Sequence, residues 1–133
     1  MLFKVLKVSF YLPLTLFEVL LPTAFREALV LSKAPPYDKY LKLIPYENES
    51  DVSVKDVLQN SKSKFIGFGD ECEPDSAYTG ICVFIGPEGG FSREEVALAA
   101  SAGFIPVTLG KRILRTETAG LTVMASIRYE FDD

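Results

Sequence analysis

The stretch Ile81-Cys82-Val83-Phe84-Ile85-Gly86-Pro87-Glu88-Gly89-Gly90-Phe91-Ser92 decides the fold of this chain. Its first five residues are apolar and predict a buried strand. The residues that follow are rich in glycine and proline, which is typical of a turn. Ser92, with Glu95 three residues later, matches the capping-box pattern, so a helix is predicted to begin there. A strand, a glycine loop and a helix start together predict a loop that holds a small ligand.

This glycine loop matches neither of the standard phosphate-binding loops. It lacks the G-x-G-x-x-G spacing, and it has no Gly-Lys-Ser/Thr ending. Glu88 also places a negative charge where a pyrophosphate would lie. That charge better suits ribose hydroxyls, an amine or a cationic ligand, although it is equally compatible with a simple helix-start carboxylate. Gly86 and Gly89 fit a tight turn as well as a close backbone approach to a ligand.

Composition limits the chemistry that the chain can perform. The 133 residues are enough for one domain with a hydrophobic core. The formal net charge is -4, so contact with RNA would have to come from a local basic patch. The absence of histidine excludes a histidine general base and a catalytic triad, and it argues against most zinc sites; no metal is expected. Cys72 and Cys82 are interpreted as reduced thiols of a cytoplasmic protein rather than as a disulfide.

The segment from Val8 to Phe17 is uncharged but does not predict a membrane anchor. It is too short to cross a bilayer, which takes about 20 apolar residues. Pro13 interrupts it, Glu18 follows it, and no small-x-small cleavage site is evident. Neither secretion nor membrane association is expected.

Strand and helix patterns alternate along the chain. Strands are predicted at 1–10, 41–44, 65–68, 81–85 and 104–109, and helices at 15–21, 23–33, 51–60, 92–102 and 117–131. This alternation predicts an α/β fold with a mostly parallel sheet and flanking helices. In such sheets ligands bind at the carboxyl ends of strands, so the segments 45–47, 86–90 and 110–118 are expected to converge on one pocket.

The spacing of apolar residues also predicts which helix positions face the core. These positions are three or four residues apart on each helix. They are Phe25, Ala28, Leu29 and Ser32; Val52, Val54, Val57 and Leu58; Val96, Ala99 and Ala100; and Leu121, Met124, Ala125 and Ile127.

Two motifs carry a resemblance to a known family. The segments Ile85–Ser92 and Leu109–Ala119, the second of which reads LGKRILRTETA, resemble the C-terminal half of the bacterial 16S ribosomal RNA uridine N3-methyltransferases of the SPOUT superfamily. Leu43 to Glu47 is similar to the strand that precedes the knot in that family. The resemblance is close over about residues 41–131 and thin over 1–40.

The resemblance implies a C-terminal trefoil knot, a feature that is very rare among folds. It implies S-adenosylmethionine as cofactor, 16S ribosomal RNA as partner, and a homodimer. It also implies two catalytic candidates: Arg115, as a cation that stabilises the uracil anion, and Glu117, which alternatively pairs with Arg112 or Arg115. The residues that match cofactor-binding segments of the family are Ile44, Pro45, Tyr46, Ile85, Gly86, Pro87, Glu88, Gly89, Leu109, Gly110, Ile113, Leu114, Thr118 and Ala119.

The chain departs from this family in its N-terminal part. Neither the family's N-terminal RNA-binding β-barrel nor the first half of its methyltransferase domain is recognisable here. Residues 1–40 are therefore expected to be a remnant of the N-terminal half, and residues 41–133 the knotted, S-adenosylmethionine-binding domain of a truncated SPOUT protein. Two alternatives remain open: a non-catalytic fragment that dimerises and binds cofactor only, and an unrelated α/β nucleotide-binding module.

Overall fold

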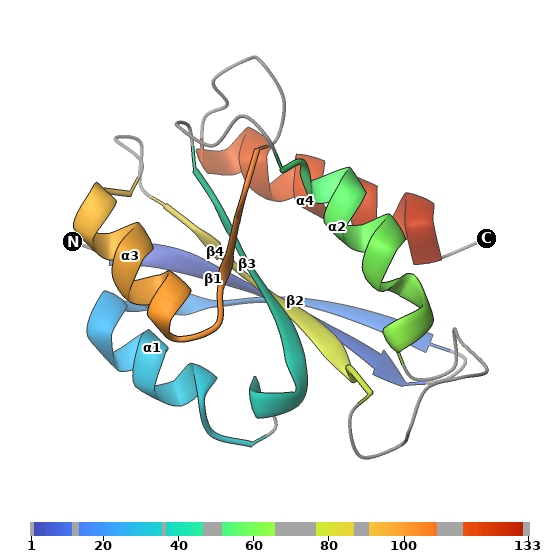
Figure 1. Ribbon diagram of the computed structural model, residues 1–133, viewed down its shortest axis with the longest axis horizontal. Coiled ribbons are helices and arrows are strands. Elements are labelled where there is room, and N and C mark those ends of the chain that lie inside the picture. The colour runs from blue at the N-terminus through green and yellow to red at the C-terminus, as the bar shows by residue number, and fades with distance from the viewer. Residues whose placement is uncertain are drawn as a thin grey trace.

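The structure is a twisted five-stranded sheet with helices on both faces (Figure 1). The computed structural model describes residues 2–11, 14–35, 37–46, 52–65, 77–86, 91–108 and 116–131; for 2–24 and 116–121 the description is of the backbone. The strands lie in the order β2-β1-β4-β3-β5. Their bounds are Leu2–Tyr11 (β1), Leu14–Ala24 (β2), Tyr40–Pro45 (β3), Gly80–Ile85 (β4) and Ile105–Val107 (β5).

Four of the five strands run in one direction. β3 is parallel to both β4 and β5, whereas β1 is antiparallel to β4 on one side and to β2 on the other. Because β2 opposes β1, β2 runs the same way as β3, β4 and β5. The predicted α/β fold with a mostly parallel sheet is therefore confirmed, with β1 as the one reversed strand among the described residues.

Each of the four co-directional strands leads into a helix. The helices are Phe25–Ser32 (α1), Val54–Ser61 (α2), Arg93–Ser101 (α3) and Thr116–Phe131 (α4), and short 3₁₀ turns occupy Tyr37–Lys39 and Lys62–Lys64. β2 leads to α1, β3 to α2, β4 to α3 and β5 to α4. These four strands end at the same edge of the sheet, which we call the carboxyl edge. The four helices therefore begin near this edge.

The two faces of the sheet bury two separate clusters, which Figure 1 shows as helix pairs on either side of the strands. The α2/α4 cluster takes residues 41 and 43 of β3 together with 81, 83 and 85 of β4; the α1/α3 cluster takes 40 and 44 of β3 together with 82 and 84 of β4. Alternate residues of a strand point to opposite faces, so each strand serves both clusters. This is why the strands read as continuous apolar runs rather than as alternating ones.

The predicted helix over 15–21 is wrong. These residues lie in β2, which pairs with β1 from Leu2↔Ala24 to Tyr11↔Leu14. Thr15 and Glu18 match a capping box locally, but pairing with β1 offers the same backbone groups a ladder of hydrogen bonds, and the aromatic and branched residues of the segment suit a strand. Pro22 lies in β2 opposite the point between Phe3 and Val5 of β1 where the register shifts. Proline is tolerated at such an irregularity because its missing N–H breaks no regular hydrogen bond of the ladder.

Most of the predicted core positions on the helices are confirmed, and two are wrong. Ala100 and Ala125 are exposed. On α3 the buried residues are Val96 and Ala99, and Ala100 lies about 100° further round the helix. On α4 the buried positions follow a spacing of four, namely Val123, Ile127 and Phe131. The side chain of Leu121 lies outside the described residues.

Two further predictions concern segments that are only partly described. Phe65 forms an isolated bridge with Tyr78, whereas 66–68 of the predicted strand lie outside the described residues. The trefoil knot stays a prediction, because segment 109–115, which joins β5 to α4, also lies outside them.

Candidate functional site

The ends of three strands meet at the carboxyl edge. Leu43 pairs with Val83 on β4 and with Ile105 on β5, and Pro45 pairs with Val107. Pro45 lies two residues after Leu43, and Ile85 lies two residues after Val83, so Pro45 and Ile85 reach the same level of the sheet. The residues that follow, Tyr46, Gly86 and Thr108, are therefore the first to leave the three strands, and they leave them side by side.

Backbone hydrogen bonds fix this edge. The amide of Tyr46 donates to the carbonyl of Val107 at 3.0 Å. On the outer side of β5, the amide of Thr108 donates to the carbonyl of Val52 at 2.7 Å, and the amide of Val54 donates to the carbonyl of Thr108 at 3.1 Å. The segment that enters α2 thus passes alongside the end of β5, so the chain after β3 and the chain after β5 are held together.

The exit of the glycine loop is equally well defined. The Ser92 hydroxyl accepts from the amide of Glu95 at 3.1 Å, and the amide of Ser92 donates to the Glu95 carboxylate at 2.9 Å. This is a complete capping box, as the sequence predicted. Gly103 ends the turn after α3 with φ +97, the left-handed conformation that favours glycine.

Five of the predicted site residues lie at this edge, although the side chains of Ile44 and Ile85 point to opposite faces of the sheet. Ile44 and Ile85 are buried, with 0% and 5% of their surface exposed, and Pro45, Tyr46 and Gly86 are half-buried. Glu117, Thr118 and Ala119 lie by their backbone in the first turns of α4. The predicted residues that lie outside the described part of the chain are Pro87, Glu88, Gly89, Leu109, Gly110, Ile113, Leu114 and Arg115.

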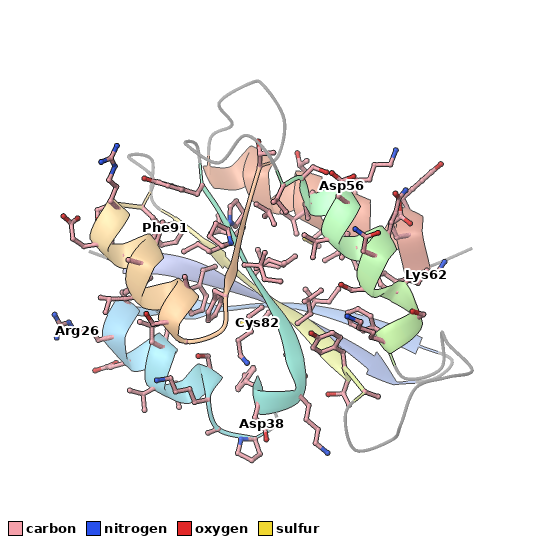
Figure 2. All side chains as sticks on the ribbon, viewed as in Figure 1. Arg26, Asp38, Asp56, Lys62, Cys82 and Phe91 are labelled. Atoms are coloured by element: carbon pink, nitrogen blue, oxygen red, sulfur yellow. The ribbon has the colours of Figure 1, made fainter. Side chains whose placement is uncertain are left out.

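Cys82 lies behind the edge, inside the α1/α3 cluster (Figure 2). It is a free thiol, 2% exposed. Burial raises the pKa of this thiol to about 12, and the charge of Lys42, opposite it on β3, lowers the pKa by a smaller amount. The thiol therefore stays protonated at neutral pH, which makes Cys82 a core residue rather than a nucleophile.

Neither a metal centre nor a membrane span is found in the part of the chain that the structure describes. No cluster of three or more histidine, cysteine, aspartate or glutamate side chains there could hold a metal ion. No helix within the same part is long and apolar enough to cross a membrane.

An aromatic group beside the edge was not predicted. Phe25 on α1 lies 5.8 Å from Phe91 and 5.9 Å from Phe84, measured between ring centroids. Phe91 is part of the motif after the glycine loop, and its single apolar side chain between Gly90 and Ser92 is the signal that could have marked it as an anchor. Nothing local in the sequence connects Phe25 with that loop, because the contact arises from the packing of α1 against β4.

Comparisons with known proteins agree with this arrangement. The family model described as "RNA methyltransferase domain" matches residues 14–128. The "Ribosomal RNA small subunit methyltransferase E" of Mesomycoplasma hyopneumoniae is 39% identical over 92 residues, which are 64% of this chain and 40% of the relative. The protein of the same name from Rickettsia conorii is 33% identical over 104 residues, which are 74% of this chain and 38% of the relative.

A solved structure is similar as well. The crystal structure of a ribosomal RNA small subunit methyltransferase E from Neisseria gonorrhoeae, bound to S-adenosyl methionine, has 38% sequence identity and a TM-score of 0.52. The match covers 83% of this chain and 38% of that one. The chain thus spans about two fifths of the length of these relatives. Since the family model matches most of the chain, the chain belongs to the RNA methyltransferase domain family.

Proposed function

We propose that this chain is the S-adenosylmethionine-binding domain of a ribosomal RNA methyltransferase that acts on N3 of a uridine in 16S ribosomal RNA. The observation that carries the proposal is the similarity, at 38% identity over 83% of this chain, to a structure bound to S-adenosyl methionine. The motifs Ile85–Ser92 and Leu109–Ala119 support the uridine N3 specificity through their resemblance to the family. A ribosomal substrate is also consistent with the cytoplasmic location that the sequence predicts.

The residues at the carboxyl edge fit such a cofactor. Adenine and ribose require flat apolar contacts together with backbone donors and acceptors, which the half-buried residues Pro45, Tyr46 and Gly86 can offer at the described edge. Ile44 and Ile85 are buried behind them, on opposite faces of the sheet. The cofactor also carries positive charge on its sulfonium and amine. Glu88 supplies a negative charge in the adjacent loop, which suits that ligand better than it suits a pyrophosphate. In this proposal the remaining contacts come from Pro87, Gly89, Leu109, Gly110, Ile113, Leu114, Thr118 and Ala119.

Arg115 is proposed to stabilise charge on the uracil. When bound, S-adenosylmethionine supplies an electrophilic methyl group; the bond from methyl carbon to N3 forms as the bond to sulfur breaks. N3 must lose its proton in the same reaction, which leaves negative charge on the neighbouring uracil oxygens. A guanidinium beside those oxygens favours that loss, and Glu117, two residues later in the chain, is proposed to orient the guanidinium. Alignment of the methyl group with N3 supplies the rest of the acceleration.

The test is transfer of a radiolabelled methyl group from S-adenosylmethionine to small-subunit ribosomal RNA, with the product nucleoside identified by mass spectrometry. The expected product is 3-methyluridine. Arg115→Ala should lower the rate about 100-fold or more, whereas Arg128→Ala, an exposed arginine near the other end of α4, should leave it unchanged. Transfer by Arg115→Ala at the wild-type rate would contradict the assigned role, and a different methylated nucleoside would contradict the specificity.

A second candidate function is cofactor binding without methyl transfer. The observation that favours it is the formal net charge of -4, which shows no overall basic excess for binding RNA. Saturable binding of S-adenosylmethionine, combined with no detectable methylation of the RNA or of whole small subunits, would favour this second candidate. A self-associating chain, expected from the family's homodimer, is compatible with both candidates.

A further inference from the structure

One aromatic ring touches both ends of the glycine loop. Phe84 is the last but one residue of β4, ahead of the loop, and Phe91 is the first described residue after it. Phe25, the first residue of α1, lies 5.9 Å from Phe84 in an edge-to-face arrangement with an interplanar angle of 67°, and 5.8 Å from Phe91 at 51°. Figure 2 labels Phe91 and Arg26, the neighbour of Phe25, on the side of the sheet that α1 and α3 cover.

The described residues that flank the loop on either side are both buried. On its entry side, Phe84 is 1% exposed within the sheet. On its exit side, Phe91 is 8% exposed, and the residue after it holds the capping box of α3. Phe25 bridges the two sides from a third element. The spacings lie in the range of favourable aromatic pairs, which hold their partners in preferred orientations.

We propose that Phe25 is a positioning residue for cofactor binding, because it fixes the separation of the two ends of the glycine loop. This inference rests on the proposed function, in which that loop binds S-adenosylmethionine. A loop whose ends are already held in place loses less conformational entropy when a ligand binds, so it binds that ligand more tightly. Phe25 does not itself touch the cofactor in this proposal; it acts through Phe84 and Phe91.

The competing interpretation is that Phe25 merely fills the core. Phe104 provides a matched control, because its ring lies 4.2 Å from the same Phe84 ring and it belongs to the same cluster. Phe104 is 3% exposed, whereas Phe25 is only half-buried, so Phe104 should contribute more to stability. Phe104 precedes β5 rather than flanking the loop. If Phe25 were a core residue only, its loss should matter less than the loss of Phe104 in every measurement.

The first test needs no cofactor. The amide of Ser92 donates to Glu95 within the capping box, so its hydrogen exchange reports on the exit of the loop. Exchange at Ser92 should be about tenfold faster in Phe25→Leu than in the wild-type chain. In Phe104→Leu it should change only as far as global stability, measured by urea unfolding, has changed. Equal exchange in the wild type and in Phe25→Leu would overturn the inference.

The second test is calorimetric titration of the same full-length variants with S-adenosylmethionine. Phe25→Leu should bind about tenfold more weakly, Phe25→Tyr should recover most of the affinity because it restores the ring, and Phe104→Leu should stay within about twofold of the wild type. The inference would be overturned if, in both leucine variants, the affinity fell in proportion to the loss of stability. If the wild type itself failed to bind while exchange at Ser92 still responded to Phe25→Leu, the proposed function would fail and the role of Phe25 in fixing the ends of the loop would stand.

Discussion

The two faces of the sheet differ in chemistry although they share the same strands. The α2/α4 cluster is built mainly from leucine, valine and isoleucine, whereas the α1/α3 cluster contains Tyr40, Phe84, Phe91 and Phe104 among its buried residues. The contrast extends to the linked elements. Phe84 and Phe91, on either side of the glycine loop, belong to the aromatic face, whereas Ile85 at the end of β4 belongs to the aliphatic face, which also buries the sides of α2 and α4.

This difference separates two tasks. Aliphatic side chains pack densely without strong orientational preference, so they stabilise the fold and tolerate volume-conserving exchange. Aromatic rings are larger, have fewer rotatable bonds and prefer specific mutual orientations, so they hold particular segments in place. We therefore expect the α2/α4 cluster, apart from Ile85 at the end of β4, to govern stability, and the α1/α3 cluster to govern stability and cofactor affinity together.

The largest effects are expected from neighbouring residues that point to opposite faces. Leu43 and Ile44 are both 0% exposed, one in each cluster. Leu43→Ala and Ile44→Ala should each lower the free energy of unfolding by about 2–5 kcal/mol, measured by urea denaturation, because each leaves a cavity. With the milder pair Leu43→Val and Ile44→Val, only Ile44→Val should weaken binding of S-adenosylmethionine. Equal affinities in this pair would break the proposed separation of tasks.

A pH effect of intermediate size should arise on the aromatic face. Burial raises the pKa of the Cys82 thiol from 9.0 to about 12, so the folded chain holds this proton more tightly than the unfolded chain does. Between those two values stability falls as pH rises, by about 1.4 kcal/mol per pH unit, and below them the thiol has no effect. From pH 10 to 11 the wild type should lose about 1.3 kcal/mol more stability than Cys82→Ala does. If the stability of the two proteins changed equally with pH, burial would not raise the pKa of the Cys82 thiol as stated.

The smallest effects are expected at two helix caps, one on each face. The Ser53 hydroxyl accepts from the amide of Asp56 at the start of α2, and the Ser92 hydroxyl accepts from the amide of Glu95 at the start of α3. Replacement of either serine by alanine should cost about 1 kcal/mol of stability. Only Ser92→Ala should also weaken cofactor binding, since Ser92 follows the glycine loop directly. A similar loss of affinity in Ser53→Ala would mean that both helix starts contribute to the site.

The parts of the fold that could be predicted are those decided by neighbouring residues. The strand over 81–85, the capping box at Ser92 and the turn at Gly103 are local patterns, and the structure contains all three. The alternation of strands and helices was enough to predict the carboxyl edge. The segment 15–21 was misassigned because its strand state depends on β1, a partner that no local pattern identifies.

The candidate site divides in the same way. Pro45, Tyr46 and Gly86 could be placed at one edge, because each follows the end of a predicted strand, whereas Ile44 and Ile85 were assigned through the family resemblance. Phe25 could not be placed there, because its role depends on how α1 packs against β4. The reversed direction of β1 could not be predicted either, since the residue pattern of an apolar strand does not depend on the direction of its neighbour.

The central claim is that the carboxyl edge binds S-adenosylmethionine, and calorimetric titration of the full chain tests it most directly. The wild type should bind with one saturable site, and Gly86→Val should abolish binding because a branched side chain would occupy the space beside the first residue of the loop. Gly103→Ala, which replaces the glycine at φ +97 after α3, should lower stability and leave the affinity unchanged. Equal binding by the wild type and a folded Gly86→Val variant would contradict the assignment of the site, and no binding by the folded wild type would contradict the proposed function.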